Sequence, residues 1–514
     1  MSAFYITTAI EYANGEPHLG HAFEKIGADA IARYRRLRGD TVHVLVGSDD
    51  HGLKVARAAQ AAGRTPGEQA NQISAAFRRA WDALGIGYDR FVRTSTAEHA
   101  AGVRALIGRI LARHPDAFYE KAYVGWYCVG CESFRTPREL DNGRCAVHPS
   151  LDIERVAESN WFFRLSAFRE QLATFLSATP EFVQPVARYN EVLSLVERGL
   201  EDVSITRASL DWGIPFPIAD ARGRHQTIYV WFDALPSYLT ATGFPEAHDG
   251  AEWPAQVHVV GKDITRFHCV LWPAVLIAAG LPLPERVWAH GFVTANGVRL
   301  SKSAGAWIDL DEAIARYGVD ALRYFLLREI PFGNDGDFSH RSMVQRINSD
   351  LANGLGNLAQ RVLSMINKNC AEQVPQPGAF TEADKKLLGS AHGLLAKLRP
   401  LFAEQAFNRA LEAIWQVVGE GDRYVDENAP WALKKTDPAR MATVLYVLAE
   451  TVRNIAILVQ PIMPDAIAKM LDQLAVPGDA RTFAALGETG ALKPGTALPK
   501  PEGVFPRYVE EAAQ

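Results

Sequence analysis

The chain has 514 residues, of which 48% are hydrophobic and 22% charged, so it has ample apolar side chains to bury and is not an intrinsically disordered protein. Its 54 lysines and arginines against 59 aspartates and glutamates exclude a uniformly basic nucleic-acid coat, but not a local basic groove. At about 150 residues per domain, this length predicts three or four structural units.

The sequence shows neither an export signal nor a membrane span. The N-terminus lacks a positively charged segment and a cleavage site. The most apolar run, Cys269 to Leu283, has the length of a core element and contains two prolines. Five cysteines are too few for a disulfide framework. We therefore expect a cytoplasmic protein that makes no contact with a membrane.

The first 60 residues predict a parallel strand–helix–strand unit. Residues 4–8 are β-branched and aromatic, as in a buried strand, and 14–17 form a loop. Apolar residues recur at helical spacing over 21–38, and valines alternate over 41–46. Two short strands joined by a helix of this length are typical of a parallel α/β sheet.

Strand patterns return much later in the chain. They cover residues 227–231, 257–260 and 287–290, with a helical or buried apolar pattern over 267–279. One α/β sheet is therefore predicted to be split by an insertion at about 116–200. Regular apolar spacing from Met343 to Met470 predicts a helical bundle. The Gly-, Pro- and Ala-rich tail from Val476 is expected to pack loosely.

The loop after the first strand ends in His18-Leu19-Gly20-His21, at the predicted start of a helix. In doubly wound sheets, ligands bind beyond the carboxyl ends of the strands, and a helix N-terminus favours phosphate there. The two histidines could donate hydrogen bonds to a nucleotide phosphate while Gly20 lets the backbone approach. Taken alone, this short motif equally fits ordinary surface or core histidines.

A second motif, Arg299-Leu300-Ser301-Lys302-Ser303, lies between Gly297 and Gly305. Lys302 on a small glycine-flanked loop suits a mobile cation that meets phosphate charge as it develops. In this order, the two motifs resemble the paired signature motifs of class I aminoacyl-tRNA synthetases.

Longer stretches make the resemblance specific to methionyl-tRNA synthetases and extend it over nearly the whole chain. These stretches are Tyr12–His21, Gly47–Gly52, Val230–Leu235, Gly261–Ile264, His290–Phe292, Asn357–Arg361 and Tyr424–Trp431. The implied fold is α/β: a split Rossmann-type parallel sheet with a zinc-knuckle insertion, followed by an all-α anticodon-binding bundle. The implied domains are two Rossmann halves at 1–115 and 201–340, the insertion at 116–200, the bundle at 341–475 and a tail at 476–514.

The resemblance implies ATP-dependent ligation of methionine to methionine tRNA through methionyl-adenylate. His18 and His21 would stabilise the transition state at the α-phosphate, and Lys302 the departing diphosphate, with Mg²⁺ accompanying ATP. Gly20, Arg299, Ser301 and Ser303 would complete the ATP site. Asp49 would bind the α-amino group of methionine. The thioether pocket would consist of Ile10, Tyr12, Trp231, Ala234, Leu235, Tyr238 and His290. Spacing alone favours core packing for Trp231 and Tyr238, and the resemblance favours the pocket.

The spacing Cys128-x2-Cys131-x13-Cys145-x2-His148 is typical of a tetrahedral zinc knuckle. Four protein ligands close the coordination sphere, which favours a structural Zn²⁺. An empty knuckle and a catalytic metal are the alternatives. On the bundle, the resemblance assigns Asn357, Arg361 and Trp431 to the anticodon, since aromatic stacking and base-edge hydrogen bonds read unpaired bases.

Several positions depart from the family pattern: Asp50, Arg299, Leu300, Ala306 and Asp422. None of these positions is a residue that the resemblance makes essential. No further tRNA-binding module is evident after the bundle, so we expect a monomer. Two other functions remain open: a paralogue that delivers the activated amino acid elsewhere, and a tRNA-binding protein that has lost catalysis.

Overall fold

The computed structural model describes residues 3–135, 140–146, 151–246, 253–295, 297–299 and 308–510. The chain forms two compact units. The sheet unit comprises Ala3–Pro17 and Val42–His290, and the helical unit comprises His18–Thr41 and Gly291–Gln514.

A sheet of seven described strands forms the centre of the sheet unit, in the order β10-β15-β14-β1-β3-β2, with β4 also paired to β3. The strands are β1 (Ala3–Thr8), β2 (Glu11–Tyr12), β3 (Thr41–Asp49), β4 (Arg90–Arg93), β10 (Val183–Gln184), β14 (Val257–Gly261) and β15 (Val287–His290). β14 runs parallel to β1 and β15, and β3 runs parallel to β2 and β4. The parallel Rossmann-type sheet and four of its predicted strands are therefore confirmed.

The strand predicted at 227–231 is only partly correct. Thr227–Ile228 forms β13, which pairs antiparallel with β12 (Thr206–Arg207). The chain then turns into the short helix α7 (Val230–Ala234), as the Phe232 N–H bonds the Tyr229 carbonyl. Val230 and Phe232 are residues that favour strands, but both are buried in the helix. Strand propensity largely reflects side-chain packing, so burial in a helix can replace it. The turn places Trp231 and Asp233 on one short helix.

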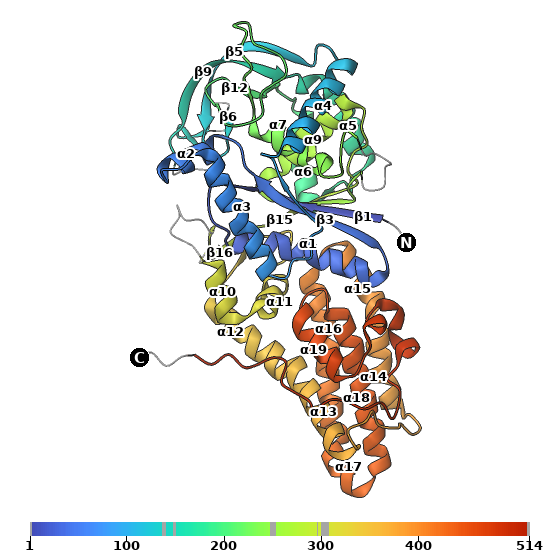
Figure 1. Ribbon diagram of the computed structural model, residues 1–514. Coiled ribbons are helices and arrows are strands. Elements are labelled where there is room, and N and C mark those ends of the chain that lie inside the picture. Colours follow the sequence, from blue (N-terminus) through green and yellow to red (C-terminus); the bar gives the residue numbers. More distant parts are fainter. Residues whose placement is uncertain are drawn as a thin grey trace. The chain divides into compact units, whose positions relative to one another are not determined.

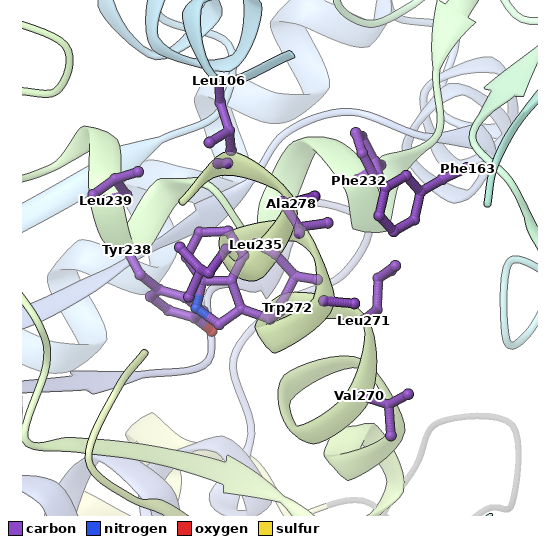
Figure 2. Close-up of a cluster of buried hydrophobic side chains, with 14 of the residues drawn as sticks. Leu106, Phe163, Phe232, Leu235, Tyr238, Leu239, Val270, Leu271, Trp272 and Ala278 are labelled. Atoms are coloured by element: carbon purple, nitrogen blue, oxygen red, sulfur yellow. The ribbon is translucent and has the colours of Figure 1, made fainter. Parts of the chain in front are cut away.

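The sheet unit has eight described α-helices. They are α2 (Leu53–Ala61), α3 (Pro66–Ala83), α4 (Ala97–Arg113), α5 (Arg169–Ala178), α6 (Val186–Glu197), α7, α8 (Ser237–Thr240) and α9 (Trp272–Ala279). Those from α4 onward contribute side chains to one hydrophobic core. In Figure 2, Leu235 and Tyr238 lie against Trp272, which is fully buried. The helix predicted over 267–279 is confirmed, and its first turn, η4 (Phe267–Leu271), is π-helical.

The insertion is built on two long antiparallel strands, β5 (Phe118–Cys128) and β9 (Glu154–Phe163), which run side by side in Figure 1. β6 (Ser133–Arg135) and β11 (Val203–Ser204) extend this sheet at its edges. The short strands β7 (Leu140–Asp141) and β8 (Arg144–Cys145) form a separate hairpin. Because β11 belongs to this sheet, the sheet extends beyond residue 200, and the exact domain boundaries stay a prediction.

The helical unit begins with α1 (Leu19–Arg38), the predicted first helix. The unit also contains a small sheet of β16 (Val293–Ala295), β17 (Val298–Arg299) and β18 (Gly336–Asp337), and β18 follows the first two helices after β17. The helices are α10 (Leu310–Tyr317), α11 (Val319–Glu329), α12 (His340–Arg346), η6 (Ile347–Gly356), α13 (Asn357–Asn369), α14 (Glu382–His392), α15 (Leu394–Ala403), α16 (Phe407–Asn428), α17 (Pro430–Thr436), α18 (Pro438–Val459) and α19 (Pro464–Gln473). The predicted bundle is confirmed.

The central helix of the bundle is α18, which packs against α13, α14, α16, α17 and α19 (Figure 1). Among the described residues, α18 is also the one helix that is long enough and apolar enough to cross a membrane. The sequence analysis did not identify it as such a candidate. Of its apolar window, 94% is buried inside the protein. That burial is what a core helix requires, because an apolar helix must cover its whole circumference.

A buried ion pair ties α1 to the bundle. Arg323 on α11 lies 2.5 Å from the Asp29 carboxylate on α1, and both side chains are completely buried. The guanidinium also donates to the carbonyls of Pro461 and Ile462, just after α18. A buried pair of this kind is stable only when further hydrogen bonds satisfy it, as they do here.

The tail from Val476 was expected to pack loosely, and this expectation is wrong. The buried Arg453 of α18 donates to the carbonyls of Ala485 at 2.7 Å and Gly487 at 2.8 Å. Its neighbour Glu450 pairs with Arg453 and also accepts the Leu492 N–H. Because backbone groups of the tail satisfy these buried charges, its glycines and prolines do not make it loose.

We predict that Arg453→Met destabilises the protein by about 3–5 kcal/mol, because Glu450 is left as a buried, unpaired charge. Denaturant unfolding measures this loss, and limited proteolysis should show earlier cleavage after residue 476. The exposed Arg409 provides the control, Arg409→Met, for which we expect a change below about 0.5 kcal/mol. Equal effects of the two variants would contradict the role of Arg453.

Candidate functional site

His18 and His21 form the N-terminal cap of α1. The His18 Nδ1 accepts the Gly20 N–H at 3.0 Å, and the His21 Nδ1 accepts the His18 N–H at 3.3 Å. The two rings stack with their centroids 3.7 Å apart. Since each Nδ1 acts as an acceptor, the neutral rings carry their proton on Nε2 and can donate from it. A Cβ at position 20 would lie 2.9 Å from the His18 ring, which explains the glycine.

A backbone contact joins Asp309, which follows the predicted loop of Lys302, to this cap. The Asp309 side chain caps α10 by accepting the Glu312 N–H, and the backbone of Asp309 forms a β-bridge with His18. The hairpin of β16 and β17 lies at the other end of the loop. The loop itself, with Ser301, Lys302 and Ser303, lies outside the described residues, as does the Arg299 side chain.

An aromatic cluster in the sheet unit, where the sequence predicts the thioether pocket, brings together residues from three segments. The Tyr12 and Trp231 rings meet edge to face with centroids 6.2 Å apart, and Phe267 stacks on Trp231 at 4.0 Å. The His268 and Trp231 rings meet edge to face with centroids 6.1 Å apart. Aromatic faces of this kind suit a polarisable thioether.

Tyr238 connects this pocket to the core. Its hydroxyl lies 2.7 Å from the His268 Nε2, while the His268 Nδ1 lies 3.0 Å from the Ile264 carbonyl. The carbonyl fixes the imidazole proton on Nδ1, so the Tyr238 hydroxyl donates to Nε2. Leu235 and Tyr238 also belong to the buried cluster around Trp272 (Figure 2), so both residues pack in the hydrophobic core. Ala234 is buried in the same segment.

Asp49 lies at the end of β3, opposite Tyr12 of β2 in the strand register. Burial, together with the charges of Asp233, Glu132 and Asp50, raises the pKa of Asp49 well above its ordinary value. Burial and the same negative neighbourhood also raise the pKa of the Tyr12 phenol. A carboxylate in this situation gains from a bound cation, because a positive charge offsets the cost of ionising it.

Asp50, one of the departures from the family pattern, is held by hydrogen bonds on both carboxylate oxygens. Ser48 and Ser74 donate to one oxygen at 2.8 and 2.9 Å. Arg93 and Ser95 donate to the other at 2.7 and 2.5 Å. These four donors surround the shorter aspartate side chain, so the departure leaves no buried charge unsatisfied.

Two predicted pocket residues lie at the margins of this group. Ile10 packs near Gly47 of β3, where a Cβ would come within 2.9 Å of its side chain. His290, at the end of β15, pairs in register with Gly261 and lies beside Asp263. His268, which the sequence analysis did not name, contacts Trp231 and Tyr238.

The three cysteines of the predicted knuckle converge. The sulfurs of Cys128, Cys131 and Cys145 lie within 4.8 Å of one another, with Cys131 and Cys145 3.6 Å apart. Three sulfurs on one tetrahedral Zn²⁺ at about 2.3 Å lie about 3.8 Å apart, so this donor set fits the metal. The contact with Cys128 and burial raise the pKa of the Cys131 thiol. His148 lies outside the described residues.

The three predicted anticodon residues lie on α13 and α17 of the helical unit. Asn357 and Arg361 are one helical turn apart, and the Arg361 guanidinium lies 5.8 Å from the Trp431 ring centroid. The Trp431 side chain is 51% exposed, which leaves ring surface for stacking. Arg361 also pairs with Asp426 at 3.1 Å, and its charge acts on Asp422, another departure from the pattern. At Gly421, a Cβ would meet Leu358 at 2.9 Å, so close packing requires glycine.

Comparison with known proteins decides the family. Residues 4–148 and 135–363 match the family model described as tRNA synthetases class I (M), and 374–514 match the anticodon binding domain of methionyl tRNA ligase. The methionine–tRNA ligase of Brucella suis is 48% identical over 99% of both chains. That of Mycobacterium leprae is 48% identical over 99% of this chain and 95% of its own.

The chain belongs to the methionyl-tRNA synthetase family. Among solved structures, the Mycobacterium tuberculosis methionyl-tRNA synthetase in complex with methionyl-adenylate has a TM-score of 0.94 and 46% identity, covering 99% of this chain and 100% of that one. The apo form of the same enzyme has a TM-score of 0.87 and 43% identity, covering 99% of each chain.

Sequence reasoning missed several residues that the fold brings together with the predicted methionine-binding residues of this synthetase. His51 and Asp233 lie inside motifs that revealed the family, but no role was assigned to them. His268 is a polar residue within an otherwise apolar run. This position in the sequence could have identified it, since a buried histidine needs a specific partner. Glu132, next to Cys131, accepts the Lys54 N–H at 2.9 Å and is 1% exposed. No sequence pattern connects residue 132 to residue 54.

Proposed function

We propose a division of labour among the residues of this methionine–tRNA ligase. The chain ligates methionine to tRNA through methionyl-adenylate, as its family does. The aromatic pocket of the sheet unit selects the amino acid, the His18 and His21 cap with Lys302 serves ATP, and Asn357, Arg361 and Trp431 read the anticodon. The observation that supports this proposal is the chain of contacts that joins Asp49, Tyr12, Trp231 and His268.

Two interactions would bind methionine, and the one with the side chain would select it. Asp49 would accept the α-ammonium group, whose positive charge stabilises the ionised form of this buried carboxylate. The side chain would lie among Ile10, Tyr12, Trp231, Ala234, Leu235 and Tyr238, with His268 beside them. Sulfur–aromatic contacts are worth about 0.3–1.5 kcal/mol each, which favours the thioether over an aliphatic chain of similar size.

Activation requires the methionine carboxylate to attack the α-phosphorus of ATP, forming a new P–O bond as diphosphate leaves. The Nε2–H groups of His18 and His21 would donate to the α-phosphate oxygens as negative charge builds on them. Gly20 would permit close approach, while Arg299, Ser301, Lys302 and Ser303 would hold the diphosphate. Mg²⁺ bound to the ATP phosphates would supply further charge neutralisation.

The direct test is ATP–diphosphate exchange with each of the twenty amino acids, followed by charging of total tRNA. We expect exchange with methionine alone and charging of methionine tRNA. Exchange without charging would support a paralogue with another acceptor. No exchange with any amino acid in a folded sample would overturn the catalytic proposal.

Catalysis and anticodon reading should separate by mutation. We predict that Trp431→Ala lowers tRNA charging about 5- to 150-fold, since stacking on one aromatic residue is worth about 1–3 kcal/mol, and leaves exchange near the wild-type rate. Lys302→Ala should instead lower exchange sharply, and tRNA binding should persist. Equal losses of both activities in the Trp431 variant would mean that this residue is mainly structural.

A structural Zn²⁺ is part of the proposal, with Cys128, Cys131, Cys145 and His148 as its ligands. When bound, the metal supplies a cross-link among segments that share little apolar core. The knuckle would thereby hold Glu132, whose carboxylate accepts the Lys54 N–H and whose charge acts on Asp49. We further propose that the enzyme is a cytoplasmic monomer, which sedimentation of the purified chain would test.

We predict one zinc per chain by elemental analysis and its loss in Cys131→Ser, together with a lower thermal unfolding midpoint. Cys370→Ser is the matched control, because Cys370 lies outside the cluster and should leave the zinc content and midpoint unchanged. A metal-free wild-type protein with an unchanged unfolding midpoint would instead favour an empty knuckle.

A further inference from the structure

Asp233 is fully buried on α7, between two histidines from other segments. Its Oδ2 lies 2.6 Å from the Nδ1 of His51, just after β3. Its Oδ1 lies 2.8 Å from the Nε2 of His99 on α4. The proposed pocket residues Trp231 and Ala234 belong to the same short helix. A carboxylate held from both sides therefore anchors one wall of the pocket.

The contacts define the proton positions on both rings. The His99 Nε2 faces both the Asp233 carboxylate and, at 3.1 Å, the Asp233 carbonyl, so this nitrogen carries a proton. The His99 Nδ1 lies 2.8 Å from the Thr240 hydroxyl. The His51 Nδ1 likewise faces an acceptor and donates to it. Both rings thus donate to Asp233, the arrangement that an ionised carboxylate requires when it is buried.

The charges agree with this geometry. Burial acts to raise the pKa of Asp233, but the charges and hydrogen bonds of His51 and His99 outweigh it and lower the pKa. Burial acts to lower the pKa of His51, and Asp233 and Asp50 outweigh that effect and raise it. Asp233 is therefore a permanent negative charge at neutral pH, and it acts directly on Asp49.

The other groups that face this network come from neighbouring elements. Glu132 and Asp50 act on Asp49, Asp50 is paired with Arg93, and the Trp212 ring meets the His51 ring edge to face at 5.2 Å. Lys54 lies over the Tyr12 ring at 4.4 Å. Asp50 is paired with the positively charged Arg93. Asp233 is paired with two histidines instead.

We propose that Asp233, clamped by His51 and His99, is a positioning residue for methionine: it fixes the helical turn carrying Trp231 and Ala234, and its charge strengthens the attraction of the Asp49 site for the substrate ammonium. This inference rests on the proposed function of the pocket. It assigns two separable effects to one side chain, one on the shape of the pocket and one on its electrostatic potential.

The test is Asp233→Asn, which preserves size and removes the charge. We expect the KM for methionine in the exchange reaction to rise about tenfold, while the KM for ATP changes less than twofold. The acid limb of kcat/KM for methionine should move to lower pH. With Asp233 neutral, Asp49 ionises more readily and stays competent at lower pH. A purely structural role would not move that limb.

Two further variants complete the test. Asp82→Asn removes an exposed carboxylate of α3 and should change neither the methionine KM nor the pH profile. His99→Gln keeps an N–H donor for Asp233 and should stay near wild type, whereas His99→Leu removes the donor and should raise the methionine KM. This pair also serves if Asp233→Asn does not fold.

The outcomes are distinct. An acid limb that stays in place in Asp233→Asn, or equal methionine KM values for His99→Gln and His99→Leu, would overturn the inference. Wild-type protein that fails to exchange with methionine would instead overturn the proposed function itself.

Discussion

Buried negative charge beyond the end of β3 is the constraint on which the proposed amino-acid site depends. Asp49, Asp50, Glu132 and Asp233 are all at most 4% exposed. An isolated carboxylate in such surroundings would take up a proton, so each needs donors or a cation. The surrounding loops, helices and knuckle supply these partners unequally, and this inequality defines what the site can bind.

The four carboxylates are stabilised in different ways. Asp50 has four side-chain donors, and Asp233 has two imidazoles. The Asp49 carboxylate has the His51 backbone N–H and a Thr94 hydroxyl at 3.4 Å, a longer contact than any at Asp50. Burial and the charges of Asp233, Glu132 and Asp50 raise the pKa of Asp49, and its few donors do not offset them. A substrate ammonium group would supply the positive charge that the Asp49 carboxylate lacks. Binding of an amino acid would therefore offset the cost of burying Asp49 in its ionised form.

The helical unit depends on the same principle of satisfying buried polar groups. Arg323 joins Asp29 of α1 to carbonyls beyond α18, and Arg453 and Glu450 fix the tail. His18 and His21 satisfy N–H groups at the start of α1, which sets their tautomers as well as their positions. In the neutral rings the remaining nitrogen, Nε2, is therefore a donor, as the proposed contact with phosphate requires.

The sequence by itself determined the family, the parallel sheet, the bundle and the cysteine cluster, because each leaves a local signal of period, spacing or motif. It placed β1, β3, β14 and β15 correctly, since buried strands favour β-branched residues. The tertiary structure alone decided that residues 230–234 are helical, that the tail is anchored by Arg453, and that His268 contacts Trp231. It also joined Asp233 to His51 and His99, which are 182 and 134 residues away. Such contacts form when distant segments pack together, and a buried charge finds its partner in space without leaving a periodic pattern along the chain.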